Sequence, residues 1–480
     1  MRSLRLGAAA TALVMLVAAC GGGTTSPSAG ASAAPSTAAS AAPSAAPSTG
    51  TGEVVNIRWY CCLGTGEDPA QLPVEQEVID EFNASHPNIK LSMEVVTYDA
   101  ARNALATQIA AGNGPDIVGP VGVGGAEAFH GQWLDLQPYI DKTGFDLSAY
   151  DPGAVSFYKD ADGQTGIPFA IYPSMIWYKK SLFAEAGLAE PPHKYGEKYT
   201  FPDGREADWD YDTIKELGLL LTVDKNGKDA TDPAFDPKSI VQYGFEPQRD
   251  DLRGLGAYFG AGALSPDGGN TVTIPEAWAD GWKYWYDGMW KDNFIMTGPV
   301  YESEEFNGDG YAFFSGRVAM SENFLWTTYG VAAAGDDWDF AAIPSHKGET
   351  TSPLNADTFR IHKDTKNPDA AFEVLSYFLG EASGKLLGIY GGMPAKVGEQ
   401  DAFFETLAQS EGFPAQVDWQ VVKDSVQYAD NPNFEAFMPK YNETLDILTK
   451  YETKWVGTAG LDMDAEIEAL KAEIQAVWGT

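Results

Sequence analysis

Cysteine and histidine are both scarce in this sequence of 480 residues, which contains three cysteines and five histidines. The histidines are scattered along the chain and form no pair with the spacing of a metal site. The motifs G-x-S-x-G and H-E-x-x-H are absent, and the stretch EASGK lacks the glycine spacing of a phosphate-binding loop. The sequence therefore predicts no bound metal, no cofactor and no enzymatic activity.

Positive charge is also in short supply, because 32 lysine and arginine residues are set against 68 aspartate and glutamate residues. The formal net charge of −36 argues against nucleic acid and anionic lipid as partners. The acidic stretch DKNGKDATD (224–232) lacks the spacing and the terminal glutamate of an EF-hand, so we interpret it as a solvated turn. A carboxylate pair in a cleft could still act as a glycosidase, which keeps a secreted carbohydrate hydrolase open as an alternative.

Long hydrophobic runs are absent from most of the sequence, and the N-terminal stretch is the exception. The sequence begins MRSLRLGAAATALVMLVAAC, in which a basic start precedes an apolar core. This core is shorter than the roughly 20 apolar residues that a transmembrane helix needs. It ends in Val17-Ala18-Ala19-Cys20, which resembles a bacterial lipobox. We expect residues 1–19 to be a signal peptide and Cys20 to receive a lipid. An ordinary signal peptide that happens to contain a cysteine is the alternative.

Residues 20–52 consist of alanine, serine, proline, threonine and glycine after the cysteine itself. Such a segment cannot bury a core, so it predicts a disordered tether with a mean reach of roughly 30 Å. The expected location is extracytoplasmic, with the body held by lipid at the outer face of the cell membrane.

Strand and helix patterns alternate in the body that begins near Glu53. Residues 54–60 form an apolar run, residues 74–85 place apolar side chains on one helical face, and residues 89–95 alternate in the period of a strand. A helix that ends at Gly112 and a short strand at 116–118 complete a β-α-β-α-β order, which predicts a parallel sheet. Helices are also predicted at 367–380 and 462–478. More than 400 residues indicate two α/β lobes.

Several segments occur in an order that resembles one known family. They are FNASHPNIKLSMEVV, IAAGNGPDIV, GIPFAIYPSMIWYKKSLFAEAGL, FFSGRVAM and HKDTKNPDAAFEVLSYFLGEASGKLLGIYGGMPA. With the lipobox, this set resembles the family-1 extracellular solute-binding proteins of ABC importers, the group like maltodextrin-binding protein. The resemblance implies an α/β, two-lobed type II periplasmic-binding-protein fold. Each lobe would be a mainly parallel sheet flanked by helices, and a hinge would join the lobes.

The resemblance also implies how the chain divides and what it does. Lobe one would comprise residues 53–169 and 350–392, and lobe two residues 170–349 and 393–480. A mono- or oligosaccharide would bind in the cleft of a monomer and favour the closed state. The closed complex would then deliver the sugar to the permease subunits of an ABC importer. A non-transport lipoprotein sensor or adhesin on the same fold is a further alternative.

The resemblance implies ligand contacts at particular positions, since sugars need flat apolar surfaces and fixed polar groups. A stacking tryptophan would be Trp326, with core packing as the alternative. The hinge would include Tyr172. Residues 246–248 match a Glu-Pro-aromatic ligand segment of the family, but Gln248 replaces the aromatic residue. The other residues of the implied site are Glu246, Asn355, Asp357, Gly392 and Met393.

Some of these positions have a second interpretation. Asn355 and Asp357 could equally be surface or capping residues. The glycines of VGPVGVGGAE (118–127) would let the backbone approach a ligand, or would simply form a flexible loop. Phe434, Phe437 and Tyr441 are expected to include core residues.

Two cysteines stand side by side in WYCCLGTG, directly after the first predicted strand. If Cys20 receives a lipid, Cys61 and Cys62 are the only remaining thiols in an oxidising compartment. Adjacent Cα atoms lie about 3.8 Å apart, whereas ordinary disulfides need roughly 4.4–6.8 Å, so a bond between them would be a strained ring. We favour this vicinal disulfide as a rigid apolar plate against a sugar, beside Trp59 or Tyr60. Two buried thiols and a disulfide-linked dimer are the alternatives.

Overall fold

The structure is a computed structural model that describes residues 53–479, except residues 62, 250, 308–310, 336, 410–412 and 415. The expected signal peptide, Cys20 and the linker lie outside the described residues, and so does Cys62. Within the part that the structure describes, no helix has the length and apolar character needed to cross a bilayer.

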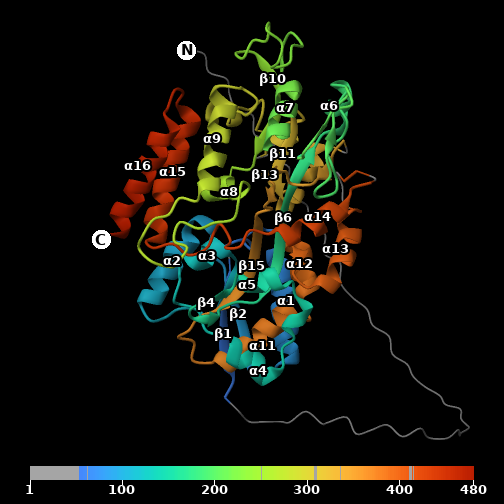
Figure 1. The fold of residues 1–480 in the computed structure, drawn as a ribbon. Coiled ribbons are helices and arrows are strands. Elements are labelled where there is room, and N and C mark those ends of the chain that lie inside the picture. The colour runs from blue at the N-terminus through green and yellow to red at the C-terminus, as the bar shows by residue number, and fades with distance from the viewer. Residues whose placement is uncertain are drawn as a thin grey trace, which may run out of the picture. The chain divides into compact units, whose positions relative to one another are not determined.

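Short strands and helices alternate along the whole chain (Figure 1). The strands are β1 (Val55–Tyr60), β2 (Ile89–Glu94), β3 (Ile117–Gly122), β4 (Lys159–Asp160), β5 (Gly163–Gln164), β6 (Pro168–Tyr178), β7 (Tyr199–Thr200), β8 (Glu206–Ala207), β9 (Val223–Asp224), β10 (Ile240–Pro247), β11 (Val318–Phe324), β12 (Asp339–Ala341), β13 (Ser345–His346), β14 (Glu349–Thr350), β15 (Leu354–Ile361) and β16 (Met393–Pro394). The helices are α1 (Leu72–Ser85), α2 (Tyr98–Ala110), α3 (Val123–Glu127), α4 (Gln137–Thr143), α5 (Pro152–Ser156), α6 (Lys180–Glu185), α7 (Tyr211–Leu221), α8 (Leu252–Ala257), α9 (Glu276–Trp290), α10 (Gly298–Tyr301), α11 (Pro368–Leu379), α12 (Ser383–Tyr390), α13 (Gln400–Leu407), α14 (Trp419–Ser425), α15 (Tyr441–Gly457) and α16 (Met463–Trp478).

The N-terminal elements follow the predicted β-α-β-α-β order. β1 pairs in parallel with both β2 and β3, and α1 and α2 form the crossovers that parallel neighbours require. Helix α1 buries Val78, Ile79 and Phe82 on the face that the apolar spacing predicted. The predicted helices near the C-terminus are also confirmed, as α11 and α16.

One strand, β6, links two groups of strands into a continuous sheet of order β2-β1-β3-β15-β6-β11-β10-β9. Residues Pro168–Pro173 of β6 pair with β15, whereas Ser174–Tyr178 pair with β11. We call β1, β2, β3, β15 and β16, with the first part of β6, the first half-sheet. The second half-sheet is the rest of β6 with β9, β10, β11 and β12. Figure 1 shows β6 running from one group of elements to the other.

Parallel and antiparallel pairing occupy different parts of this sheet. The parallel pairs are β1 with β2 and β3 in the first half-sheet, and β10 with β11 in the second. The strands that pair with β6 run antiparallel to it. At the edge of the sheet, β9 and β10 run antiparallel to each other. Each half-sheet therefore contains parallel strands, and β6 lies between the parallel strands of the first half-sheet and those of the second.

Most of the large aromatic side chains lie in the interior. Tryptophans recur on the buried face of α9, at Trp278, Trp282 and Trp285, and Trp455 of α15 packs 5.7 Å from Trp282 between ring centroids. Buried indole N–H groups need acceptors, and Trp282 donates to the backbone oxygen of Leu252 at 2.5 Å. Many of the aromatic residues of the sequence therefore pack in the core.

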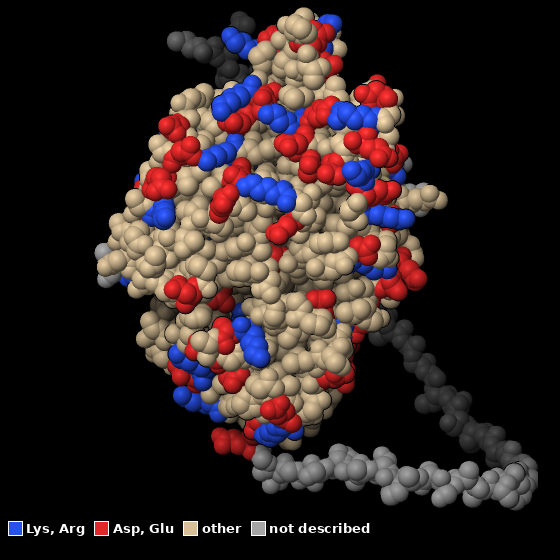
Figure 2. Space-filling model, in the orientation of Figure 1, with Lys and Arg blue, Asp and Glu red and all other residues tan. Residues whose placement is uncertain are grey.

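Acidic and basic side chains are interspersed over the face of the molecule shown in Figure 2. Many form exposed ion pairs, such as Lys347 with Glu276 at 3.0 Å and with Asp280 at 2.7 Å. Pairs of this kind contribute little stability individually, because water screens them.

Candidate functional site

The two half-sheets meet where β6 changes partners, between Pro173 and Ser174. Every residue of β6 is buried. The hydroxyl of Ser352, just before β15, donates to the backbone oxygen of Ser174 at 2.9 Å and ties the crossing point to the neighbouring segment. Side chains from both half-sheets converge around this junction.

On the first half-sheet, five residues of the sequence-predicted site lie together. The hydroxyl of Tyr172 on β6 donates to Oδ2 of Asp357 on β15 at 3.3 Å. Met393 of β16 pairs with Ile171, and a Cβ on Gly392 would lie 2.9 Å from the Tyr172 hydroxyl oxygen. The absence of a side chain at Gly392 therefore makes room for Tyr172. Asn355 is half-buried and lies opposite Tyr172 in the strand register.

A second carboxylate approaches from the segment between α14 and α15. The backbone N–H of Gly124 in α3 donates to Oε2 of Glu435 at 3.2 Å. A Cβ on Gly124 would lie only 2.5 Å from Oε1 of Glu435 and 2.6 Å from the hydroxyl oxygen of Tyr441. Burial raises the pKa of Glu435, against the opposing effect of Arg253. The glycines of 118–127 thus belong to β3 and α3 and are not a flexible loop.

Arg253 on α8 contributes a buried cation to this junction. Its guanidinium Nη2 donates to Oδ2 of Asp251 at 2.7 Å and to the hydroxyl of Tyr441 at 3.4 Å. The residue is almost completely buried, and its Nη1 has no hydrogen-bond partner among the described residues. Buried donors in proteins are nearly always paired, so this atom is available for a further acceptor.

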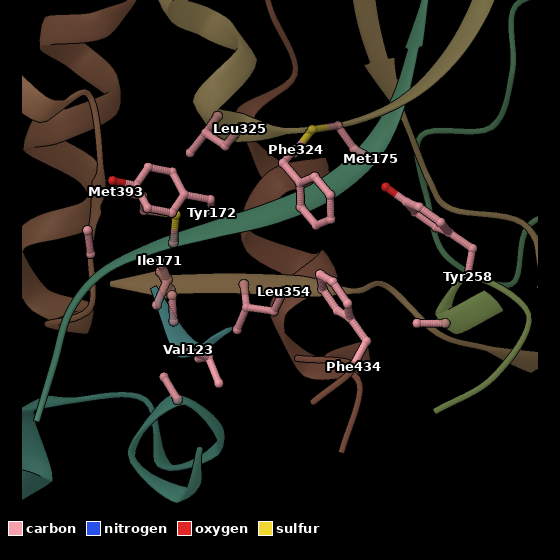
Figure 3. Close-up of a cluster of buried hydrophobic side chains, with 14 of the residues drawn as sticks. Val123, Ile171, Tyr172, Met175, Tyr258, Phe324, Leu325, Leu354, Met393 and Phe434 are labelled. Carbon is pink, nitrogen blue, oxygen red and sulfur yellow. The ribbon is translucent and has the colours of Figure 1, made fainter. Parts of the chain in front are cut away.

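Aromatic rings pack together at the junction, among other buried hydrophobic side chains (Figure 3). The ring of Phe324, at the end of β11, stacks on Trp326 with centroids 5.8 Å apart and on Phe434 with centroids 6.3 Å apart. Tyr258 lies 6.2 Å from Phe324 on another side. Figure 3 shows Phe324, Phe434 and Tyr258 together with Tyr172 and other buried side chains of both half-sheets. Trp326 is half-buried and therefore retains exposed surface.

Other residues of the sequence-predicted site lie away from the junction or are already engaged. Trp59 has no exposed surface, packs 4.7 Å from Phe378 between ring centroids and donates to the oxygen of Gly119 at 2.6 Å. We therefore correct its expected role from ligand contact to core residue. Glu246 is buried in an ion pair with Arg249 at 2.6 Å.

The second oxygen of Glu246 accepts from the backbone N–H of Met296 at 3.0 Å. Because both oxygens are engaged, we also leave Glu246 out of the proposed contacts. Gln248 is half-buried, and its backbone N–H donates to the oxygen of Glu322 at 2.8 Å, which extends the pairing of β10 with β11.

Cys61 is completely buried and disulfide-bonded. Its sulfur lies 3.3 Å from the position of a Cβ on Gly66, beside the buried Glu75. Because Cys61 offers no surface to a ligand, an apolar plate would have to come from Cys62, which lies outside the described residues. The vicinal pairing and the plate both remain predictions.

We expect mass spectrometry to find Cys61 and Cys62 joined in one tryptic peptide. Freshly exported protein would be denatured and alkylated without reductant, then compared with a reduced sample. A vicinal bond should block alkylation at both positions until reductant is added, because neither sulfur is then a thiol. Two alkylated cysteines in the unreduced sample, or a disulfide-linked dimer, would contradict this pairing.

The free energy of unfolding should depend on pH through Asp357. Burial, with an added effect of Glu435, raises the pKa of this carboxyl from 3.8 to about 7. The folded state therefore holds the proton more tightly than the unfolded chain, so this contribution to stability is complete below pH 4 and is lost as the pH rises through 7.

Asp357→Asn should remove this part of the pH dependence and stabilise the protein at pH 8 by about 1–3 kcal/mol relative to the parent. Urea unfolding at pH 4.5 and pH 8 measures the effect. The same difference between variant and parent at both pH values would show that Asp357 does not titrate in this window.

The residues that sequence reasoning missed are Gly124, Arg253 and Glu435. Arg253 had no local signal, because the sequence around it carries no recognisable motif. Glu435 lies among Phe434, Phe437 and Tyr441, whose spacing predicted core packing. That prediction holds for Phe434 and Tyr441, which are buried, whereas Phe437 is half-buried.

Comparisons with known proteins agree with this architecture. The family model described as bacterial extracellular solute-binding protein matches residues 67–385. A putative binding protein of Brucella abortus (strain 2308) is 33% identical over 134 residues, which are 26% of this chain and 30% of that one. The chain thus spans about a third of the length of the curated relatives that it matches.

Solved structures match over nearly the whole body. An ABC substrate-binding protein of Listeria monocytogenes in complex with cycloalternan has a TM-score of 0.65 at 19% identity, covering 89% of this chain and 100% of that one. The cyclic alpha-maltosyl-1,6-maltose binding protein of Arthrobacter globiformis has a TM-score of 0.62 at 18% identity, covering 88% and 99%. These likenesses confirm the predicted α/β, two-lobed periplasmic-binding-protein fold. Because the family model covers well over half of its length, the chain belongs to the bacterial extracellular solute-binding protein family.

Proposed function

We propose that this protein captures a carbohydrate at the junction of its two half-sheets and delivers it to the permease of an ABC importer. The observation that supports this best is that Glu435 lies near both Asp357 and the guanidinium of Arg253, and follows Phe434, whose ring stacks on Phe324 of the other half-sheet. Trp326 in turn stacks on Phe324. Sugar rings stack their C–H faces on aromatic side chains, and their hydroxyls bond to carboxylates and guanidinium groups. The residues come from both half-sheets, so a ligand that bound all of them would favour closure.

Unpaired buried polar atoms support a hydroxyl-rich ligand. Nη1 of Arg253 can donate, and Oδ1 of Asn323 on β11 can accept, and neither has a partner among the described residues. A sugar hydroxyl can do both, because it donates one hydrogen bond and accepts others. A purely apolar ligand would leave both atoms unpaired at a cost in free energy.

The names of proteins with a similar fold include oligosaccharide ligands as well as the monosaccharide alpha-D-tagatose. One is described in complex with cycloalternan and another as a binder of cyclic alpha-maltosyl-1,6-maltose. We extend carbohydrate binding to the present chain as part of the proposal. Members of the family work outside the cytoplasm, and a lipid on Cys20 with the linker 20–52 would hold a monomeric body at the membrane.

The hinge of the proposed closure is β6. The expected lobe one (53–169 and 350–392) and lobe two (170–349 and 393–480) divide β6 near its start. The change of strand partners favours a first crossing slightly later, between Pro173 and Ser174. Met393 and Pro394 pair with the first part of β6. This pairing places both residues with lobe one, so the last crossing out of lobe one also falls slightly after the expected boundary at residue 392.

Thermal-shift measurements with linear and cyclic gluco-oligosaccharides test this function. The true ligand should raise the melting temperature by mass action, with no hydrolysis product on chromatography. Small-angle scattering at saturating ligand should then give a smaller radius of gyration than without ligand. Product formation would favour the hydrolase instead, and an unchanged radius would contradict closure.

A further inference from the structure

A group of metal-ligating side chains lies outside the junction, where α3 ends near the β4–β5 hairpin. Nδ1 of His130 lies 2.9 Å from Oε2 of Glu127. Asp160, at the end of β4, completes a set in which one ligand atom from each residue lies within 4.8 Å of the others. We propose that Glu127, His130 and Asp160 bind a divalent transition-metal ion such as Zn²⁺.

Local geometry suits this set to a metal. Glu127 and His130 are three residues apart in a helical turn, so their side chains project from the same face. Atoms that share one zinc ion at about 2.1 Å are at most about 4.2 Å apart, so the three groups must close slightly. Asp160 is exposed on a two-residue strand. Its Oδ1 accepts from the backbone N–H of Asp162 at 2.7 Å, whereas its Oδ2 accepts only a long hydrogen bond from the hydroxyl of Thr165 at 3.4 Å, so a metal would replace the contact with Thr165.

The electrostatic surroundings attract a cation. Asp162, in the turn after β4, adds a third carboxylate, whose Oδ2 lies 3.9 Å from the position of a Cβ on Gly131, next to His130. Opposing charges are Arg360, whose Nη2 lies 3.8 Å from Oε1 of Glu127, and Lys363, whose ammonium donates to the backbone oxygen of Gly131. The carboxylate oxygen that faces Arg360 is not the one that faces His130, so both interactions can coexist.

Ligand type narrows the choice of metal. One imidazole with two carboxylates suits Zn²⁺, Mn²⁺ or Ni²⁺ better than Ca²⁺, which prefers six to eight oxygen ligands. Three protein ligands leave room for water in the remaining coordination positions. His130 and Asp160 both have exposed surface, so an ion has access from solvent.

The site would also contact the segment between α14 and α15. The imidazole of His130 stacks on Phe437, with ring centroids 4.2 Å apart and an angle of 29° between the planes. Phe437 belongs to the same segment as Glu435, which bonds to α3. A bound metal would therefore hold His130 in the orientation that this contact uses.

By comparison, the acidic stretch 224–232 offers no such site. Asp224 accepts from the backbone N–H groups of Asn226 at 2.7 Å and of Lys228 at 3.0 Å, and the ammonium of Lys228 pairs with Asp232 at 2.7 Å. The stretch forms a turn, as predicted, but Asp224 is buried in it and not solvated, and the stretch contains no histidine that could join a ligand set.

Titration of the full-length protein with ZnCl₂ alone tests the proposal. After treatment with EDTA and its removal, calorimetry should show one Zn²⁺ bound per chain, and the melting temperature should rise with added Zn²⁺. His130→Ala should weaken binding at least 50-fold, and Asp160→Asn at least tenfold. Asp160 is exposed on a hairpin, so its variant tests the site even if His130→Ala fails to fold.

A matched control is His193→Ala. His193 forms a similar pair with Asp418, at 2.9 Å, but this pair is not part of a three-residue ligand set among the described residues. The control should bind Zn²⁺ as the parent does. The proposal is overturned if the parent binds no Zn²⁺ at 1 mM, which is on the order of the dissociation constants of weak extracellular metal sites. It is also overturned if Asp160→Asn binds Zn²⁺ as tightly as the parent does. This test is independent of sugar binding.

Discussion

Replacing Gly124 with valine should weaken sugar binding by about 100-fold or more, equivalent to about 2.7 kcal/mol, while the protein still unfolds cooperatively. A Cβ at this position would lie 2.5 Å from Glu435 and 2.6 Å from Tyr441, well inside contact distance. The valine side chain would therefore hold α3 away from the segment that contains Glu435 and prevent closure around a ligand. Calorimetry with the tightest sugar from the thermal-shift screen measures the loss.

Two further variants make this test specific. Gly124→Ala should cause a smaller loss, because a single methyl group displaces the carboxylate of Glu435 and the hydroxyl of Tyr441 less than the branched side chain of valine does. Gly388→Val is the matched control, since Gly388 is an exposed helical glycine on α12 and a Cβ there meets nothing within 4 Å. If Gly124→Val binds sugar as tightly as Gly388→Val does, the contact of α3 with Glu435 has no part in binding.

Truncating Trp326 to alanine should weaken sugar binding by about 1–3 kcal/mol, or roughly 5- to 150-fold. Trp326 is half-buried at the end of an aromatic stack with Phe324 and Phe434, so it has surface left to cover a sugar ring. Trp326→Phe should keep part of the affinity, because the smaller ring preserves a flat apolar surface. Calorimetry of the three proteins with the same sugar gives the comparison.

The control for this prediction is Trp290→Ala. Trp290 is a half-buried tryptophan on α9 whose indole N–H donates to the oxygen of Trp455 at 2.9 Å, away from β6. Its loss should reduce the free energy of unfolding without changing sugar affinity. Equal sugar affinity in Trp326→Ala and the parent would assign Trp326 to packing alone, which is the alternative interpretation of this residue.

Local patterns in the sequence predicted many of the elements well. The alternation of β1, α1 and β2 and the helices α11 and α16 follow from apolar periodicity, proline in the first turn and terminal glycine. Such signals depend on neighbouring residues, so a single sequence contains them. The resemblance to a known family added the two-lobed fold and positions such as Tyr172 and Asp357, which the structure joins by a hydrogen bond.

Other positions lie in surroundings that the sequence did not indicate, because burial is a tertiary property. Trp59 follows an apolar run beside two cysteines, and nothing local distinguishes a ligand contact from a core residue there. Its burial depends on Phe378, which is more than 300 residues further along the chain, and on Gly119. The ion pair that engages Glu246 likewise depends on how Arg249 folds back beside it.

The sequence by itself determined the class of fold, the order of its elements and the acidic charge, because composition and short-range periodicity are properties of the chain alone. Only the tertiary structure decided which side chains meet. Gly124 and Glu435 are 311 residues apart, and the three residues of the proposed metal site come from a helix and a hairpin. Such contacts exist only after burial of the two half-sheets around β6 has brought distant segments together, and no local pattern encodes that arrangement.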